Sequence, residues 1–373
     1  MTRLLKHPVF IVSAIAILAL ISFIIFSRSN HLDTRNDVSE SSDSSQSASQ
    51  ATDENVAKKT QQSINPDAPD PVKIVSPQKI NNEGNEGVQN SFVYVSKKRP
   101  EKAPKDVIIS SLDDLKQLFE SLNYDKAAFK RGHRTVPRLT FESVSENWQT
   151  SSHELPVDLK KEVFFRLMAP LILIANEEVL LERKRVETLA IDDPQLIAIA
   201  KRYRILTQDQ NTLSTEQREQ LLLRVDIIPP SLVLAQGAEE SGWGTSRFTL
   251  EGNAFFGQWD FSGNGMVPQQ QRKELGNYGI ARFDSPLDSV RGYLINLNTN
   301  NAYRELREYR AELRLENQPI TGIALANTLL RYSERGQAYV DGIQSMIRFN
   351  NLESVDEAYL SDEAPLHLIS ANQ

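Results

Sequence analysis

An apolar run without any charged residue, residues 9–26, lies close to the N-terminus of the 373-residue chain. A helix of about 20 apolar residues is long enough to cross the hydrocarbon core of a bilayer. Arg3 and Lys6 precede the run, and basic residues favour the cytoplasmic side of a membrane. We therefore predict a cytoplasmic tail at 1–8, a transmembrane anchor at 9–27 and export of the rest. Cleavage as a secretory signal is the alternative, although the run ends without a small-x-small cleavage motif.

The following segment, residues 28–105, is polar, and its stretch 38–52 reads VSESSDSSQSASQAT. Such a composition buries too little apolar surface to offset the entropy lost on ordering, which predicts a disordered linker. Apolar residues recur at helical spacing from residue 107 onward. The part of the chain that folds is therefore about 250 residues long, which is enough for a substantial core.

Helical signals dominate this folded part. Ser111 precedes LDDLKQLFESL, and Ser214 with Gln217 forms the pattern of a capping box. A long apolar pattern covers residues 155–187, where Pro170 predicts a break or a kink. Further helices are expected after Pro229 and Pro230 and over residues 285–298, 303–315, 321–335 and 338–349.

Strand signals are weak, and only the glycine-rich stretch 254–283 predicts a short hairpin or a small sheet. We therefore predict a mainly α fold with a small β-lobe. Its organisation is expected to be a helical extension at 106–224, a second domain at 225–352 and a C-terminal tail at 353–373.

Composition excludes several classes of function. Lys and Arg number 42 against 49 Asp and Glu, and the net charge of −7 argues against a dedicated nucleic-acid binder. Cysteine is absent, which excludes disulfides, zinc-thiolate sites and thiol nucleophiles. None of the five histidines stands at metal-ligand spacing. We therefore predict no metal and no cofactor, and carboxylates remain as the catalytic candidates.

The sequence PSLVLAQGAEESGWG at residues 230–244 contains the best of these candidates. A glycosidase needs a carboxylic acid in a partly apolar pocket, where a raised pKa lets it protonate the leaving oxygen. Glu239 and Glu240 end a helix of small and apolar residues, about 100° apart around its axis. Periodicity does not choose between them, and a solvated helix end with Gly242 as C-cap is the alternative interpretation.

Three blocks of the sequence resemble one known domain. They are AQGAEESGWG followed by NAFFG at 253–257, ARFDSPLDSVRGYLINLNTNNAYREL at 281–306, and LRYSERGQAYVDGIQSMI at 330–347. In this order they resemble the glucosaminidase domain of glycoside hydrolase family 73, over residues 225–350. The resemblance implies a lysozyme-like, mainly helical fold.

The same resemblance implies an enzyme that cleaves the glycan strands of peptidoglycan on the reducing side of N-acetylglucosamine. By position, Glu240 corresponds to the general acid of the family. With the predicted anchor, this indicates a single-pass protein of the bacterial inner membrane with its catalytic domain in the periplasm, or a secreted enzyme if the anchor is cleaved. A lytic transglycosylase, a muramidase or a non-catalytic peptidoglycan-binding scaffold are the competing interpretations. The sequence leaves any protein partner unknown.

The second catalytic group is sought among Asp260, Glu274 and Asp284, because relatives often carry an acid in the β-lobe. Glu274 is the first choice, since it precedes the segment 278–283 as the lobe acid of the family precedes its aromatic segment. A substrate-assisted route through the 2-acetamido group needs no second carboxylate.

Further site residues follow from the resemblance. Tyr332 and Tyr339 match the terminal tyrosines of the family, and Tyr332 is expected to orient the acetamido group or the reacting water. Trp243 and Trp259 are expected to stack on sugar, with core packing as the alternative for Trp243. Gln236, Asn253 and Tyr339 complete the predicted substrate contacts, with helix packing as the alternative for the two tyrosines.

Overall fold

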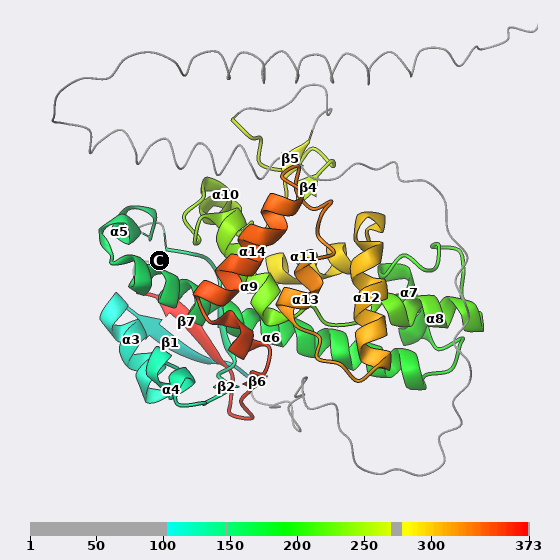
Figure 1. The fold of residues 1–373 in the computed structure, drawn as a ribbon, viewed down its shortest axis with the longest axis horizontal. Coiled ribbons are helices and arrows are strands. Elements are labelled where there is room, and N and C mark those ends of the chain that lie inside the picture. The colour runs from blue at the N-terminus through cyan, green and yellow to red at the C-terminus, as the bar shows by residue number, and fades with distance from the viewer. Residues whose placement is uncertain (1–102, 146–147, 270–277, 372–373) are drawn as a thin grey trace, which may run out of the picture. The chain divides into compact units, whose positions relative to one another are not determined.

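The computed structural model describes residues 103–145, 148–269 and 278–371 (Figure 1). The predicted anchor, nearly all of the predicted linker and Glu274 lie outside these ranges. All described residues belong to one compact unit, Gln50–Gln373. Within the described ranges, no helix is both long enough and apolar enough to cross a membrane.

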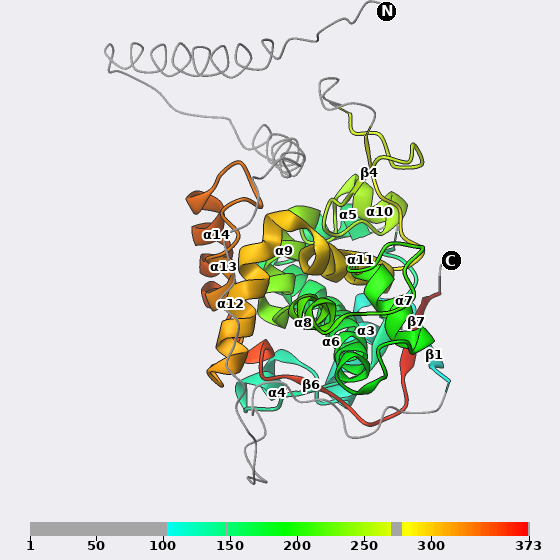
Figure 2. The same cartoon turned by 90° about the vertical axis from the view of Figure 1, so that its right-hand side faces the viewer.

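Helices make up most of the described residues, which confirms the mainly helical prediction (Figure 1). In chain order they are α3 (Leu112–Ser121), α4 (Lys126–Lys130), α5 (Trp148–Glu154), α6 (Val157–Thr188), α7 (Pro194–Arg202), α8 (Thr215–Arg224), α9 (Pro230–Ser241), α10 (Arg247–Gly252), α11 (Pro286–Thr299), α12 (Arg304–Leu315), α13 (Gly322–Ala326) and α14 (Gln337–Phe349), with short 3₁₀ turns η2 (Asn301–Tyr303) and η3 (Leu352–Val355). Figure 2 shows α12, α13 and α14 next to one another along one side.

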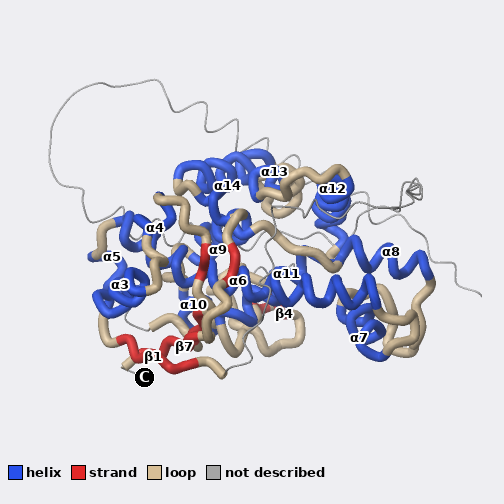
Figure 3. Tube along the Cα trace, turned by 90° about the horizontal axis from the view of Figure 1, so that it is seen from below, coloured by secondary structure: helices blue, strands red, loops and turns tan. Residues whose placement is uncertain are grey.

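Three strands from distant parts of the chain form the largest sheet. They are β1 (Lys105–Ile109), β3 (Leu139–Phe141) and β7 (Leu366–Ser370), and β7 lies in the centre, parallel to both neighbours. Figure 3 shows β1 and β7 side by side below the helices. Two smaller ladders pair β2 (Thr135–Val136) with β6 (Tyr359–Leu360) in parallel and β4 (Trp259–Asp260) with β5 (Gly279–Ile280) in antiparallel.

The C-terminal segment therefore differs from the expected tail at 353–373, because it contributes η3, β6 and β7. The strand β7 is five residues long, and only Leu368 in it is buried. A strand this short shows no alternation of apolar and polar residues that could reveal it in the sequence. Its partners lie more than 200 residues away along the chain, where local sequence patterns carry no signal.

Local signals at the helix ends behave as predicted. The Ser111 hydroxyl accepts the Asp114 N–H at 3.1 Å, and Ser214 and Gln217 form the reciprocal capping box.

The break or kink predicted at Pro170 does not interrupt α6, which runs through this residue as one helix. Pro170 is buried, and α6 packs against α9 and α11, so tertiary packing offsets the hydrogen bond that a proline removes.

The helix α9 is the most buried of the helices that the structure describes. All of its residues are buried except Glu239 and Glu240, and it contacts α6, α13, α14 and η3. Its N-cap is Pro229, which provides no side-chain acceptor. The carboxylate of Asp356 supplies one instead, because it accepts the Ser231 N–H at 2.8 Å and the Ser231 hydroxyl at 2.7 Å.

The segment that enters α9 is held by a buried carboxylate among arginines. Asp226 is 2% exposed and accepts two hydrogen bonds from Arg314, at 2.8 and 2.6 Å. Arg183 lies 3.5 Å from the same carboxylate, and buried Arg310 donates to the Asp226 and Ile227 carbonyls. Burial acts to raise the pKa of Asp226, but Arg310, Arg314 and Arg183 outweigh it and lower this pKa below its usual value.

We expect Asp226→Asn to lower the free energy of unfolding at pH 7 by about 3–5 kcal/mol, because the arginines then stay buried without a counter-charge. A carboxyl with a lowered native pKa stabilises the fold above its unfolded pKa of about 4 and loses this contribution as the pH falls below it. The variant should therefore lose less stability than the wild type between pH 5 and pH 3. Urea unfolding across this range measures both effects. Asp113→Asn, which removes an exposed carboxylate 3.4 Å from Lys116, is the control and should change little; equal losses in both variants would contradict the assignment.

Candidate active site

Glu240 lies in the last turn of α9, just before the helix ends sharply. Gly242, Trp243 and Gly244 all have positive φ angles, of 57°, 62° and 79°. Gly242 is the left-handed C-cap, as predicted. The hydroxyl of buried Ser241 donates to the Gly237 carbonyl at 2.6 Å and accepts the Gly244 N–H at 2.9 Å, so the turn is closed on both sides. This turn leaves Glu240 half-buried at the edge of the core.

Four buried tyrosines surround Glu240. The Tyr339 hydroxyl donates to its Oε1 at 3.1 Å, and the Tyr332 ring is stacked on Tyr339 with centroids 5.2 Å apart. Burial raises the pKa of Tyr332 and of Tyr339, and the negative charge of Glu240 raises both further. Tyr293 and Tyr303 show the same two effects. All four hydroxyls therefore keep their protons at neutral pH, and the Tyr339 hydroxyl donates its proton to Glu240.

Tyr293 and Tyr303 are not among the predicted site residues, although both lie within the block 281–306 that carries the family resemblance. Tyr293 belongs to α11 and Tyr303 to η2. A tyrosine in an otherwise apolar helix pattern is indistinguishable from a packing residue until the elements are placed together.

Gln236, predicted to contact substrate, lies one helical turn before Glu240 and is fully buried. Its Nε2 donates to the Tyr339 hydroxyl at 2.9 Å, and its Oε1 accepts from the Tyr293 hydroxyl. The structure thus brings Gln236, Glu240, Tyr332 and Tyr339 together. Within this group, Gln236 lies in the core and Glu240 is half-buried.

Glu239 takes part in a different interaction. Its Oε1 lies 2.8 Å from Nη2 of Arg335, and the Arg335 guanidinium also lies over the Tyr339 ring, 5.0 Å from its centroid. Arg335 reaches this place because the helix expected at 321–335 ends at Ala326, where the Thr328 hydroxyl donates to the Leu325 carbonyl and a turn follows. The two adjacent carboxylates therefore have different partners: Glu239 pairs with the Arg335 guanidinium, and Glu240 accepts from the Tyr339 hydroxyl.

Trp243 and Asn253, two other predicted substrate contacts, interact with residues of the protein itself. The Trp243 ring packs edge-on against Phe165 and Phe164, at centroid distances of 5.3 and 5.7 Å. This is the core-packing alternative considered for Trp243. The Asn253 amide donates to the carbonyls of Glu142 and Phe283, at 3.0 and 3.2 Å. A sugar contact by either residue stays a prediction.

The small β-lobe forms as predicted, with β4 paired to β5. Trp259 on β4 stacks on Tyr278 with centroids 4.9 Å apart. Asp260 accepts the Ser262 backbone N–H and hydroxyl, and these two hydrogen bonds lower its pKa. Asp284 is exposed. Of the three carboxylates predicted as the second catalytic group, Glu274 lies outside the described residues.

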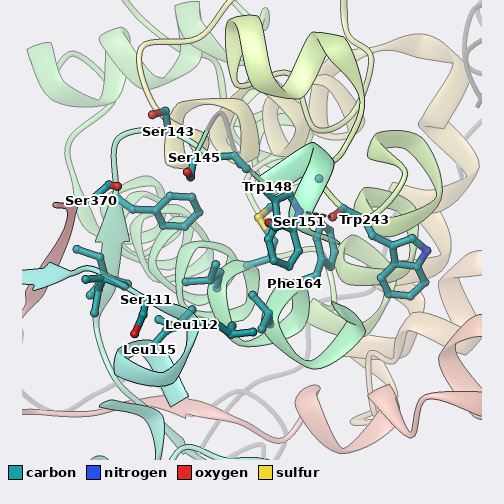
Figure 4. A pocket seen from close by; sticks show the side chains of 18 of the residues that line it. Ser111, Leu112, Leu115, Ser143, Ser145, Trp148, Ser151, Phe164, Trp243 and Ser370 are labelled. Carbon is teal, nitrogen blue, oxygen red and sulfur yellow. Dashed lines mark hydrogen bonds between the residues drawn. The ribbon is translucent and has the colours of Figure 1, made fainter. Parts of the chain in front are cut away.

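A separate cavity of about 400 Å³ lies between α3, α5 and α6, at the ends of β1 and β7 (Figure 4). Figure 4 shows Trp148 and Trp243 toward one end of it and several serine hydroxyls around it. Among the described residues that line it, none is acidic, basic or histidine. The described lining of this cavity thus differs from the surroundings of Glu240, where a carboxyl is present.

We expect Trp243→Ala to lower the free energy of unfolding by about 2–4 kcal/mol, because the ring fills the space beside Phe164 and Phe165. Trp243→Phe retains a ring at this position and should recover most of the loss. Urea unfolding followed by far-UV circular dichroism measures both variants. An alanine variant as stable as the wild type would contradict the packing role.

Comparisons with known proteins fit this geometry. The sequence profile of the Glucosaminidase family, described as Mannosyl-glycoprotein endo-beta-N-acetylglucosaminidase, matches residues 216–352. Protein bax of Escherichia coli (strain K12) is 33% identical over 198 residues, which are 51% of this chain and 70% of that relative. No solved structure gives a significant match. The resemblance predicted from the three sequence blocks is thus confirmed, and the matched range includes Glu240 and its four tyrosines.

Proposed function

Because the chain belongs to the glucosaminidase family, we propose that it is a glycoside hydrolase of bacterial peptidoglycan. In this proposal it cleaves the β-1,4 bond on the reducing side of N-acetylglucosamine, and Glu240 is the general acid. The observation that supports the proposal is the position of Glu240, half-buried at the end of α9 and contacted by the hydroxyl of buried Tyr339. A partly buried carboxyl beside apolar and aromatic groups suits an acid that protonates a leaving oxygen.

The proposed reaction transfers one proton from the Glu240 carboxyl to the glycosidic oxygen as the bond between that oxygen and the anomeric carbon breaks. A water molecule supplies the new oxygen at the anomeric carbon. Activation of this water, or direct attack at the carbon, is assigned to Glu274, and the 2-acetamido group of the substrate is the alternative. Tyr332 supports Tyr339 by stacking, and Trp259 in the β-lobe is assigned to sugar stacking.

We expect Glu240→Gln to reduce the release of soluble glycan fragments from purified sacculi by about 10²–10⁴-fold, because the amide cannot donate the proton. Glu239→Gln is the matched control, since it changes the neighbouring carboxylate that pairs with Arg335, and it should retain most of the activity. If both variants keep wild-type rates, Glu240 has no acid role.

Mass spectrometry of the released fragments tests the bond that is cleaved. Reducing-end N-acetylglucosamine is the expected product. Reducing-end N-acetylmuramic acid would assign the chain as a muramidase, and an anhydro-muramic end as a lytic transglycosylase. Binding to sacculi without any fragment release would favour a non-catalytic scaffold. Including Glu274→Gln in the same assay tests the second group, and full activity of that variant would favour the substrate-assisted route.

We place the protein in the inner membrane, with residues 9–26 as an uncleaved anchor and the catalytic domain in the periplasm. The double substitution Ile17→Arg and Leu18→Arg should abolish insertion, because each arginine at the centre of a membrane helix costs about 2.5–3.5 kcal/mol. Alkaline carbonate extraction is expected to leave the wild type in the membrane and to release the variant. A soluble wild-type protein shortened by about 26 residues would instead indicate a cleaved signal peptide.

A further inference from the structure

A buried chain of hydrogen bonds ends on Glu240. The Tyr293 hydroxyl donates to Oε1 of Gln236, Nε2 of Gln236 donates to the Tyr339 hydroxyl at 2.9 Å, and this hydroxyl donates to Oε1 of Glu240 at 3.1 Å. Gln236 and Glu240 are four residues apart on one helix, so their side chains lie on the same face of α9.

The two ends of the Gln236 amide decide the direction of this chain. Nε2 only donates and Oε1 only accepts. Because Tyr339 faces Nε2, its oxygen is an acceptor toward Gln236, and its single proton is left for Glu240. With the amide turned over, Tyr339 would give that proton to Oε1 of Gln236, and Glu240 would lose the donor.

The surroundings hold the amide in this orientation. Gln236 is 0% exposed, and the Tyr293 ring at its acceptor end is stacked on Phe256 with centroids 4.1 Å apart. At its donor end, Tyr339 is stacked on Tyr332 and covered by the Arg335 guanidinium. A buried donor or acceptor left without a partner is costly. Turning the amide would therefore require the Tyr293 and Tyr339 hydroxyls to reverse their hydrogen bonds at the same time.

We propose that Gln236 is a positioning residue, which directs the Tyr339 hydroxyl onto Oε1 of Glu240. This inference rests on the proposed role of Glu240 as general acid. Since Oε1 is the accepting oxygen, the proton that Glu240 delivers is on Oε2. In the reaction, the Oε2–H bond breaks, an O–H bond forms on the glycosidic oxygen, and the electron pair of the cleaved carbon–oxygen bond stays on that oxygen. The carboxylate that remains is stabilised by the Tyr339 hydroxyl.

The variant Gln236→Met tests this, because methionine has a similar length and neither donates nor accepts strongly. Methionine leaves Glu240 as an acceptor for Tyr339 but removes the donor that positions and polarises the Tyr339 hydroxyl, so the hydrogen bond to Glu240 weakens and the ionised form of Glu240 is less favoured. The midpoint of the Glu240 titration should therefore move to higher pH, by less than the shift of about one to two units that complete loss of a hydrogen bond to a charged group would give. Nuclear magnetic resonance of full-length chain with ¹³C-labelled glutamate carboxyls measures it, with Glu240→Gln identifying the signal.

The same variant should move the alkaline limb of the activity profile on sacculi to higher pH and lower the maximal rate by about 10–100-fold. Tyr339→Phe removes the hydrogen bond to Glu240 itself and should give larger shifts in the same direction, and the double variant should give no more than Tyr339→Phe alone, because both act through one contact. Tyr293→Phe keeps the shape of the ring, removes the donor that holds Oε1, and should shift the midpoint in the same direction by a smaller amount. It also covers the case in which Gln236→Met does not fold.

The matched control is Gln344→Met on α14. This substitution also removes two hydrogen bonds of a glutamine Nε2, to the Ile323 carbonyl at 3.1 Å and to Asn327 at 2.9 Å. It should leave both the titration midpoint and the alkaline limb in place. If Gln236→Met or Tyr293→Phe behaves like this control, Gln236 is structural only and the proposal is overturned. If the wild type releases no glycan at all, the proposed function fails, while the titration midpoints still decide whether Gln236 directs Tyr339.

Discussion

The helix α9 can be buried only if the N–H groups of its first turn find acceptors. The first N–H groups of a helix have no partner within it, and leaving them unpaired in a core is costly. The sequence supplies Pro229 and Pro230 at this end, and neither offers a side-chain acceptor. Asp356 provides the acceptor from a distant part of the chain, and it also accepts the Gly322 N–H at 2.9 Å. One carboxylate thus joins the starts of α9 and α13.

The consequence appears at the other end of α9. A helix whose apolar residues are buried all round can expose side chains only where it leaves the core, and here these are Glu239 and Glu240. Arg335 pairs with Glu239, while Tyr339 and the tyrosines around it face Glu240. The two adjacent carboxylates therefore have different surroundings, which neither propensity nor helical periodicity could distinguish. Buried polar groups of this kind impose a unique arrangement, since each hydroxyl must keep its partner.

Signals that act over a few residues could be predicted from the sequence. Ser111, the Ser214 capping box and the Gly242 C-cap all depend on neighbours within a few residues, whereas β4 and β5 pair across a longer loop. The parallel sheet could not be predicted, because β7 pairs with β1 and β3 across more than 200 residues. The same limit applies to the site. Glu240 was found from a local motif, whereas the link from Tyr293 through Gln236 to Tyr339 joins α9, α11 and α14 and emerges only from their packing.

The position of β7 sets an order of events during synthesis. The ribosome makes this strand after every other described element, yet it lies between β1 and β3 in the finished sheet. Asp356, which completes the first turn of α9, is also made late, after all the helices it serves. When Glu240 has just been synthesised, the nascent chain therefore still lacks both the central strand β7 and Asp356, the acceptor for the first turn of α9. The hydrolytic machinery can assemble only once nearly the whole domain has been translated.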